Sequence, residues 1–500
     1  MLAKSSMWAW VVSYVVVIVF LVGQTDQEYP AVVLSAFAFA FVQWRLPACR
    51  PVSHDWLCPW NWALAVFFLQ LVVMPVLITL AGPALVVLPY LPSPFAINMA
   101  ILINTIAFLS FSCTYSHLAG RRKDRTDRAL ERATTQRSVQ LLPPLWSIWI
   151  CLSLGIIGTL LAFGSLSRFL GYFTNPADYR DMPEPTWSGF FGQVLRPFLG
   201  FAFAMLWCRR MDRIDRARSR LGFAVFTALM LAAVTLSYAT FSYNRASFTV
   251  PLLAMAAVSL AKRERLSLAV MALGVVLVLI IAPALGAYRS GDFTGQELLA
   301  DRGTRDLLLQ KMDLMESIQA YGVAPQFMGF LLENNGWTAA PHWGEVTVSS
   351  LLSPLPILGK SFRKSNGTTI YNTMIYGTPE IADQIVPFQG ELFLDFNFVG
   401  VIMGYCVLGW IAYKLQRAFE RSGSCLDFFI WQYAAIWTFF LIFGSVSVVS
   451  QVYFYFGWPI YVHFLYRRLT SRSARELTHI SDEGALVRSR VWTPATLSHR

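Results

Sequence analysis

Residues 61–81 read NWALAVFFLQLVVMPVLITLA, a run of 21 positions without a charged side chain. At a rise of about 1.5 Å per residue, such a run forms a helix roughly 30 Å long, which is the thickness of the hydrocarbon core of a bilayer. The rest of the 500-residue chain is similar, because 56% of its residues are hydrophobic and only 14% are charged. Soluble domains carry about 25% charged residues. The sequence therefore predicts an all-α, polytopic integral membrane protein.

Eleven further apolar runs, bounded by charged residues, proline or glycine, raise the prediction to about 12 transmembrane helices. The second, eighth and last runs are short for a complete crossing. The predicted spans are Met7–Gly23, Ala31–Trp44, Asn61–Ala81, Phe95–Leu118, Leu141–Gly164, Gly189–Cys208, Leu221–Ala239, Ser247–Ala261, Leu266–Leu285, Leu392–Tyr413, Phe428–Val449 and Val452–Tyr466.

The distribution of Lys and Arg predicts the orientation of these spans. With the N-terminus inside, 29 of the 40 Lys and Arg residues lie on inward connections or the C-terminal tail, and every short inward loop is basic. The positive-inside rule favours this arrangement, with both termini in the cytoplasm and the chain in the cytoplasmic (inner) membrane. The net charge of +11 then reflects topology, and nucleic acid is not an expected partner.

Four regions follow from this topology. We expect nine helices with short loops over residues 1–285, a large periplasmic or extracellular and mostly helical loop over 286–389, three helices over 390–466, and a disordered cytoplasmic tail over 467–500. The inward connections are too short to fold a catalytic domain. The sequence contains no phosphate-binding loop, zinc-ligand spacing or hydrolase elbow, so we expect no cofactor and no metal, and any chemistry at the outer face.

Several arginines lie where the predicted topology makes them unusual. Arg196 lies about seven residues inside the sixth span, next to Pro197, where an unpaired Arg costs on the order of 3 kcal/mol. Its position predicts either a polar cavity or a side chain that extends to the headgroups. Four more arginines are expected at the outer face, and as a set we interpret them as a site for a diphosphate headgroup, which guanidinium groups bind well. These four are Arg245, Arg289, Arg302 and Arg305.

Acidic residues and one histidine provide candidate general bases on the same side. His342 and Glu345 lie three residues apart in PHWGEVTVSS, within the predicted external loop. Glu391 and Asp395 lie four residues apart in GELFLDFNFVG, on one face of the predicted helix, and Asn397 follows inside the apolar run. Glu391 is equally consistent with a purely electrostatic role at a helix N-terminus.

Three segments resemble the O-antigen and exopolysaccharide repeat-unit polymerases, the Wzy-type family. The segments are NRASFTVPLLAM (244–255), PHWGEVTVSSLLSPLPILGK (341–360) and GELFLDFNFVG (390–400). In the last segment Phe393 replaces the Tyr that the family pattern has, and Val399 replaces its Gly. The resemblance implies a GT-C-type membrane glycosyltransferase that polymerises polyprenyl-diphosphate-linked oligosaccharides at the outer face of the membrane. It also implies a flippase and a chain-length regulator as partners.

Under this interpretation each candidate residue receives an expected role. We expect Glu391, Glu345 or His342 to act as the base, and Arg196, Arg245, Arg289, Arg302, Arg305, Asp395 and Asn397 to bind substrate, with Trp337, Trp343, Tyr371 and Tyr376 available to stack on sugars. An O-antigen ligase has the same architecture and donor, and a transporter or flippase also matches twelve spans. A third alternative, a glycosyltransferase with an acidic pair in its first external loop, would use Asp26 and Glu28.

Overall fold

The structure is a computed structural model, and it describes residues 28–51, 58–82, 88–133, 143–174, 187–212, 220–239, 245–261, 269, 324–335, 340–355, 359–379, 386–422 and 424–468. Within these ranges the chain forms helices and loops and no β-strand, as the all-α prediction requires. The predicted span Met7–Gly23 lies outside the described residues, as do Leu266–Leu285 apart from Ala269 and most of the predicted tail.

Six of the described helices are long and apolar enough to cross a membrane. They are Pro59–Leu80, Pro94–Gly120, Leu145–Phe163, Ser188–Asp212, Leu221–Tyr238 and Phe388–Glu420. Four shorter apolar helices accompany them at Pro30–Arg45, Val250–Leu260, Cys425–Phe440 and Val446–Phe456. The composition and length of these helices are those of a polytopic membrane protein.

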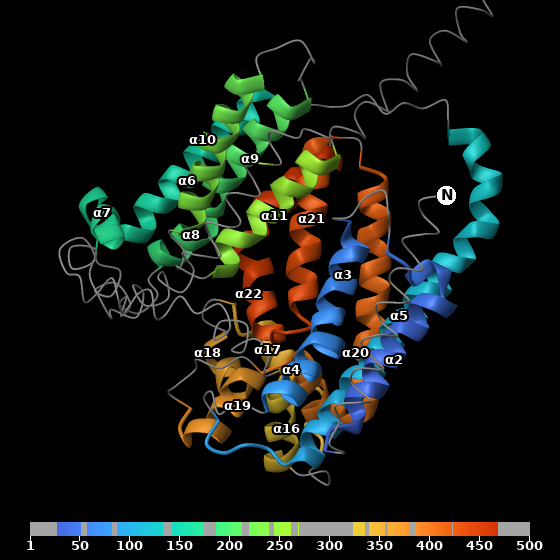
Figure 1. The fold of residues 1–500 in the computed structure, drawn as a ribbon. Coiled ribbons are helices and arrows are strands. Elements are labelled where there is room, and N and C mark those ends of the chain that lie inside the picture. Colours follow the sequence, from blue (N-terminus) through green and yellow to red (C-terminus); the bar gives the residue numbers. More distant parts are fainter. Residues whose placement is uncertain are drawn as a thin grey trace, which may run out of the picture.

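One group of helices packs around α5 (Pro94–Ala133) and α20 (Phe388–Glu420), which lie side by side in Figure 1. The group also contains α2 (Pro30–Arg45), α3 (Pro59–Phe68), the π-helical turn η2 (Leu69–Val73) and α4 (Met74–Ala81). Its core is aromatic, and the Trp60 ring stacks with the rings of Phe111 and Tyr115. Gly409 of α20 lies so close to α5 that an added Cβ would be 2.5 Å from the carbonyl oxygen of Phe111.

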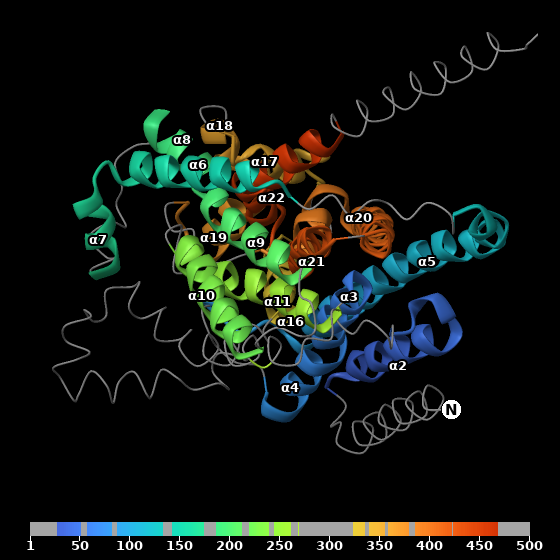
Figure 2. The ribbon, with the colours of Figure 1, turned by 90° about the horizontal axis from the view of Figure 1, so that it is seen from above.

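A second group contains α6 (Leu145–Phe163), α7 (Leu166–Thr174), α8 (Trp187–Leu195), α9 (Pro197–Asp212), α10 (Arg220–Ala239) and α11 (Arg245–Ala261). Figure 2 shows α6, α8, α9 and α10 on the opposite side of the molecule from α2 and α5. Helix α6 meets α8 and α9 at small residues, since a Cβ on Gly155 or Gly158 would lie within 2.6 Å of backbone atoms of the facing helices. Small residues allow this close packing between membrane helices.

Helix α21 (Cys425–Phe440) lies between the two groups and joins them. Its first backbone N–H donates to the Asp212 carboxylate of α9 at 3.1 Å. From the other group, the Trp62 indole N–H of α3 donates to Gln432 Oε1 at 2.9 Å. The structure therefore packs both groups against one central helix.

The end of α21 differs from the sequence-based expectation of a single helix over Phe428–Val449. Helix α21 ends at Phe440, a turn follows, and α22 (Val446–Phe456) begins with Ser445 as its N-cap. The Ser445 hydroxyl accepts from the N–H of Val448 at 3.2 Å, which stabilises the start of the new helix. A further helix covers residues 458–468. The continuous apolar composition conceals this break.

Short helices gather at one end of the bundle, the lower end in Figure 1. They are α16 (Ala324–Asn335), α17 (Glu345–Leu352), α18 (Gly359–Phe362), the 3₁₀ turn η4 (Arg363–Ser365) and α19 (Gly367–Tyr376), all from the segment predicted to be a large loop. Met328, Leu331, Val346 and Tyr371 from this segment belong to the same buried core as α5 and α20. We call these five elements the cap.

Arginines are concentrated at the opposite end of the bundle. Arg209 donates to the backbone carbonyl of Pro143 where α9 ends, and Arg467 is paired with Asp427 near the start of α21. Arg50 donates to the carbonyl of Gln43 at 3.1 Å at the end of α2. The cap and these basic side chains are thus separated by the length of the bundle.

Candidate functional site

Helix α20 is broken at Phe396 and Asn397, five and six residues beyond Glu391. Asp395 lies just before the break. Phe396 has φ −141° and ψ 20°, and Asn397 has φ 53° and ψ −143°, neither of which is helical. A Cβ added to Gly400 would lie 2.3 Å from the carbonyl oxygen of Leu392, so only glycine fits the geometry that follows the break. After the break, residues 398–420 are long enough for a span of about 34 Å.

Because of the break, backbone carbonyl groups just before it accept hydrogen bonds from the residues that precede α17. His342 N–H donates to the Leu394 oxygen and Trp343 N–H donates to the Asp395 oxygen, each at 3.0 Å. This pairing holds residues 342–345, which we call the HWGE turn, against α20. Trp343 has a φ of 53°, a left-handed conformation that is uncommon for a large side chain.

The Asp395 carboxylate completes the N-terminus of α17. Its Oδ1 accepts from the N–H groups of Gly344 at 3.1 Å and Val346 at 2.9 Å, and its Oδ2 accepts from Thr347 N–H at 2.8 Å. Gly344 occupies the N-cap position and has no side chain to supply this oxygen. A fully buried carboxylate on another helix therefore takes the place of a local cap.

This arrangement exposes the polar side chains of the HWGE turn. His342 and Glu345 are exposed, and the side chain of Trp343 is 76% exposed. The Phe396 ring lies edge-on to the Trp343 ring with 6.4 Å between centroids. The turn thus combines an imidazole, a carboxylate and an aromatic surface, and its backbone is fixed by Asp395. Strained backbone held in this way is typical of functional sites.

Glu391, one turn earlier on α20, is fully buried among hydroxyl groups. Its Oε1 accepts from the Ser350 hydroxyl of α17 at 2.8 Å, and its Oε2 accepts from the Val446 N–H of α22 at 2.7 Å. A Cβ on Gly367 would lie 2.5 Å from Glu391 Cγ, so α19 also closes on this side chain. The Glu391 carboxylate therefore caps the N-terminus of α22, as the Asp395 carboxylate caps the N-terminus of α17.

Hydroxyl groups continue from Glu391 towards the surface. Ser450 Oγ donates to the Ser350 carbonyl at 2.9 Å, and the hydroxyls of Ser353 and Ser447 lie 3.1 Å apart. Ser350 Oγ also accepts from the N–H of Gly367 at 3.2 Å. These bonds join α17, α19 and α22 around the buried carboxylate. The sequence shows the serines, but not that they meet at Glu391.

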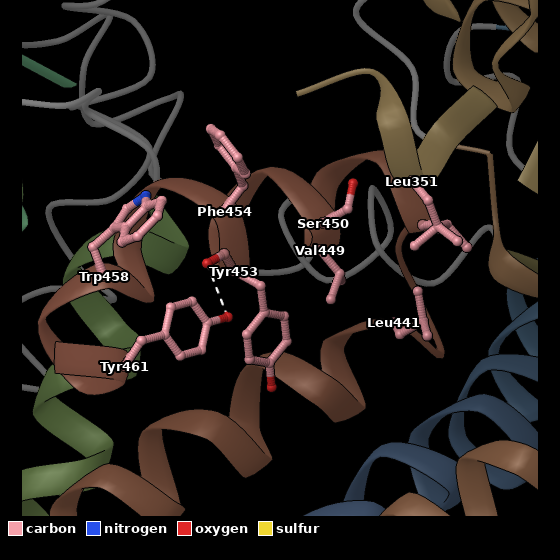
Figure 3. Close-up of a pocket in the computed structure, with 9 residues that line it drawn as sticks. Leu351, Leu441, Val449, Ser450, Tyr453, Phe454, Trp458 and Tyr461 are labelled. Carbon is pink, nitrogen blue, oxygen red and sulfur yellow. Dashed lines mark hydrogen bonds between the residues drawn. The ribbon is translucent and has the colours of Figure 1, made fainter. Parts of the chain in front are cut away.

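A groove of about 380 Å³ runs along α22 next to this cluster. Figure 3 shows that α22 forms its length, with Leu351 of α17 at one end and Trp458 at the other. Its lining consists of Leu351, Leu441, Val446, Val449, Ser450, Tyr453, Phe454, Trp458 and Tyr461. The wall is mainly hydrocarbon and aromatic carbon, which favours an apolar ligand.

Arg196 lies in the other helical group and does not meet the HWGE turn or Glu391. It is 3% exposed, at the junction of α8 and α9. Its guanidinium donates to Gln193 Oε1 at 2.5 Å and lies over the Phe163 ring, 5.3 Å from the centroid. The side chain is therefore held inside the bundle, where a glutamine and an aromatic face stabilise the charge.

The remaining predicted substrate-binding residues are placed only in part. Arg289, Arg302 and Arg305 lie outside the described residues, as does Trp337. Arg245 is the first residue of α11, and the structure does not describe its side chain. Asn397 forms the break in α20 and is half-buried, so its backbone conformation is the role that the structure shows.

The described residues contain no group of three or more His, Cys, Asp or Glu side chains arranged to hold a metal ion. No family model matches the chain, and comparison with curated proteins and with solved structures gave no significant match.

Proposed function

We propose that this chain is an integral-membrane glycosyltransferase that joins polyprenyl-diphosphate-linked oligosaccharide units at the outer face of the cytoplasmic membrane. The observation that carries the proposal is the HWGE turn. Its backbone is fixed by three hydrogen bonds to a buried carboxylate, whereas His342, Trp343 and Glu345 are exposed. A rigid turn that presents a base and an aromatic ring suits a sugar acceptor.

The proposed reaction requires two things of the protein. A base removes the proton from the acceptor hydroxyl as its oxygen attacks the anomeric carbon, and the bond between that carbon and the diphosphate oxygen breaks. Such a base contributes about 10² to 10⁴ in rate. His342 or Glu345 supplies it, and the flat ring of Trp343 orients the sugar. The diphosphate leaves as a stabilised anion, which cations bind.

Glu391 has a different role in this proposal from that of a base. Both of its oxygens accept hydrogen bonds, and the side chain is fully buried. We therefore assign Glu391 and Asp395 to positioning, since they hold α22 and α17 in place.

The arrangement of charges supports an outer location for the cap. Arg50, Arg209 and Arg467 lie at the opposite end of the bundle, where the positive-inside rule expects the cytoplasm. The test is a single cysteine in place of exposed Ser361, in a chain whose seven natural cysteines are replaced. A membrane-impermeant maleimide should label it in intact cells. Labelling only after the cells are opened would place the cap inside and end the proposal.

The function itself is tested by His342→Ala and Glu345→Gln in the native host. We expect long polysaccharide chains to be lost and single lipid-linked repeat units to accumulate, at normal protein levels. His117→Ala is the matched control, because His117 is exposed on the inward half of α5, far from the cap. Normal chain lengths from both variants would remove the HWGE turn as the reaction site. Missing transfer of full-length chains to lipid A core would instead identify a ligase.

A further inference from the structure

The groove along α22 offers a ligand almost no free polar group. The Tyr453 hydroxyl donates to the carbonyl of Ala434 at 2.8 Å, outside the groove, and the Tyr461 hydroxyl donates to the carbonyl of Tyr453 at 3.2 Å (Figure 3). Ser450 Oγ donates to the carbonyls of Ser350 and Ser447. Since the hydroxyls of its wall are engaged within the protein, the groove favours a hydrocarbon chain.

Three cations lie close together in the cap, in the sequence GKSFRK. Lys360 is in α18, and Arg363 and Lys364 are in η4. All three side chains are exposed, and in the described part of the chain no carboxylate is paired with them. A cationic group on the side that we assign to the exterior is unusual under the positive-inside rule, which makes an anionic ligand a reasonable explanation.

Hydrogen bonds connect this cationic segment to the edge of the groove. Arg363 Nε donates to the Ser353 carbonyl at 3.3 Å, and Ser353 lies two residues beyond Leu351, which lines the groove. Next to it, the Pro354 carbonyl accepts from the Tyr455 hydroxyl of α22 at 3.1 Å. The cationic segment is therefore attached to the chain just beyond Leu351, at the edge of the groove.

From this juxtaposition we infer that the groove and Lys360, Arg363 and Lys364 form the binding site for a polyprenyl diphosphate. The isoprenoid chain lies along α22, and the diphosphate lies against the three cations. The inference rests on the proposed function, and it assigns the donor lipid to residues outside the set of arginines expected from the sequence.

Charge and shape both favour this lipid over a phospholipid. A diphosphate ester carries two to three negative charges, which three adjacent cations match better than the single charge of phosphatidylglycerol. Phe454, Trp458 and Tyr461 give the groove flat aromatic walls, against which the planar, branched double bonds of isoprene units pack closely.

The test is binding of farnesyl diphosphate to the full purified chain in nanodiscs of phosphatidylcholine, with inorganic pyrophosphate and farnesol as comparison ligands. We expect farnesyl diphosphate to bind at least tenfold more tightly than either comparison ligand. Arg363→Ala combined with Lys364→Ala should weaken binding at least tenfold, and Lys414→Ala, an exposed cation at the other end of α20, should not change it. Leu351→Trp should narrow the groove and weaken binding, whereas exposed Val348→Trp on the same helix should not.

Two results would overturn the inference. One is unchanged affinity in the Arg363/Lys364 variant; the other is equal displacement of the probe by phosphatidylglycerol, which would show a general site for anionic lipids. These results are separable from failure of the proposed function. Loss of polymer in the His342 and Glu345 variants would support the proposed function. Unchanged probe binding in the Arg363/Lys364 variant would, independently, exclude the groove as the lipid site. Specific binding of farnesyl diphosphate, together with normal polymer in the His342 and Glu345 variants, would support the groove and remove the HWGE turn as the reaction site.

Discussion

Glu391 Oε2 accepts a hydrogen bond from the backbone N–H of Val446 at 2.7 Å, although 55 residues separate the two in the chain. Four residues after Glu391, the Asp395 carboxylate accepts three backbone N–H groups at the start of α17. Two acidic residues on one helix thus cap the N-termini of two other helices, α22 and α17, which pack on each other. This relationship organises the cap.

Asp395→Asn should lower the thermal stability of the protein strongly. The amide retains one acceptor oxygen, and its NH₂ group then faces backbone N–H donors in a buried site. We expect a loss of about 2–3 kcal/mol in the free energy of unfolding. Asp212→Asn is the control, because the Asp212 carboxylate also accepts from a backbone N–H, that of Cys425, but is only half-buried, so its substitution should cost less. Equal unfolding temperatures for the two variants in detergent would contradict the capping role.

Glu391→Gln should reduce the amount of folded protein and the amount of polymer together. If the amide NH₂ faces Val446, two donors oppose each other; if it faces Ser350, the Ser350 hydroxyl must accept where it now donates and loses its own acceptor. Either loss in a buried site costs about 1–3 kcal/mol. The measurement is polymer per unit of membrane-inserted protein, which should stay within about twofold of the wild type. Loss of polymer at normal protein levels and normal stability would instead return Glu391 to the role of base.

Gly400→Ala should prevent the break in α20 from forming correctly. The added Cβ would lie 2.3 Å from the Leu392 carbonyl oxygen, so backbone atoms must move. We expect low protein yield and increased proteolysis in the cap. Gly120→Ala is the matched control, because Gly120 is in α5 with no atom within 4 Å of the added Cβ, and alanine favours helix by up to about 1 kcal/mol. Similar yields from the two variants would argue against a required close approach at Gly400.

Arg196→Met should leave both stability and polymer length nearly unchanged. Methionine is an unbranched apolar side chain of similar length, and it removes the cost of keeping a charge out of water. Gln193 then loses its partner, which limits any gain to about 1 kcal/mol. Unfolding temperature and gel ladders are the two measurements. A shortened ladder at unchanged stability would show that Arg196 contacts the donor, as the sequence first suggested.

The sequence predicts the helical class well because the signal is local. Runs such as Asn61–Ala81 correspond to helix Pro59–Leu80 of the structure, since apolar length alone specifies a span. The four-residue spacing of Glu391 and Asp395 also predicts correctly that both lie on one helix. The turn between Phe440 and Val446 is hidden because its residues are as apolar as the helices on either side.

The contacts that build the site are not local, and the sequence alone gives little indication of them. The cap of α17 comes from Asp395, and nothing within PHWGEVTVSS reveals a partner about 50 residues away. The missing cap at Gly344 is the one local sign, because a helix that starts at glycine lacks a side-chain acceptor. The break at Phe396 and Asn397 contains no proline, and Gly400 is its only sequence indication.

The fixed geometry of residues 388–395 has a mechanical consequence. Because this short helical segment is attached through one carboxylate to α22 and through another to α17, it cannot tilt without carrying both. A tilt of this segment would therefore displace the apolar wall of the groove along α22 and the exposed Trp343 ring together. Binding of a lipid in the groove along α22 would then displace the HWGE turn.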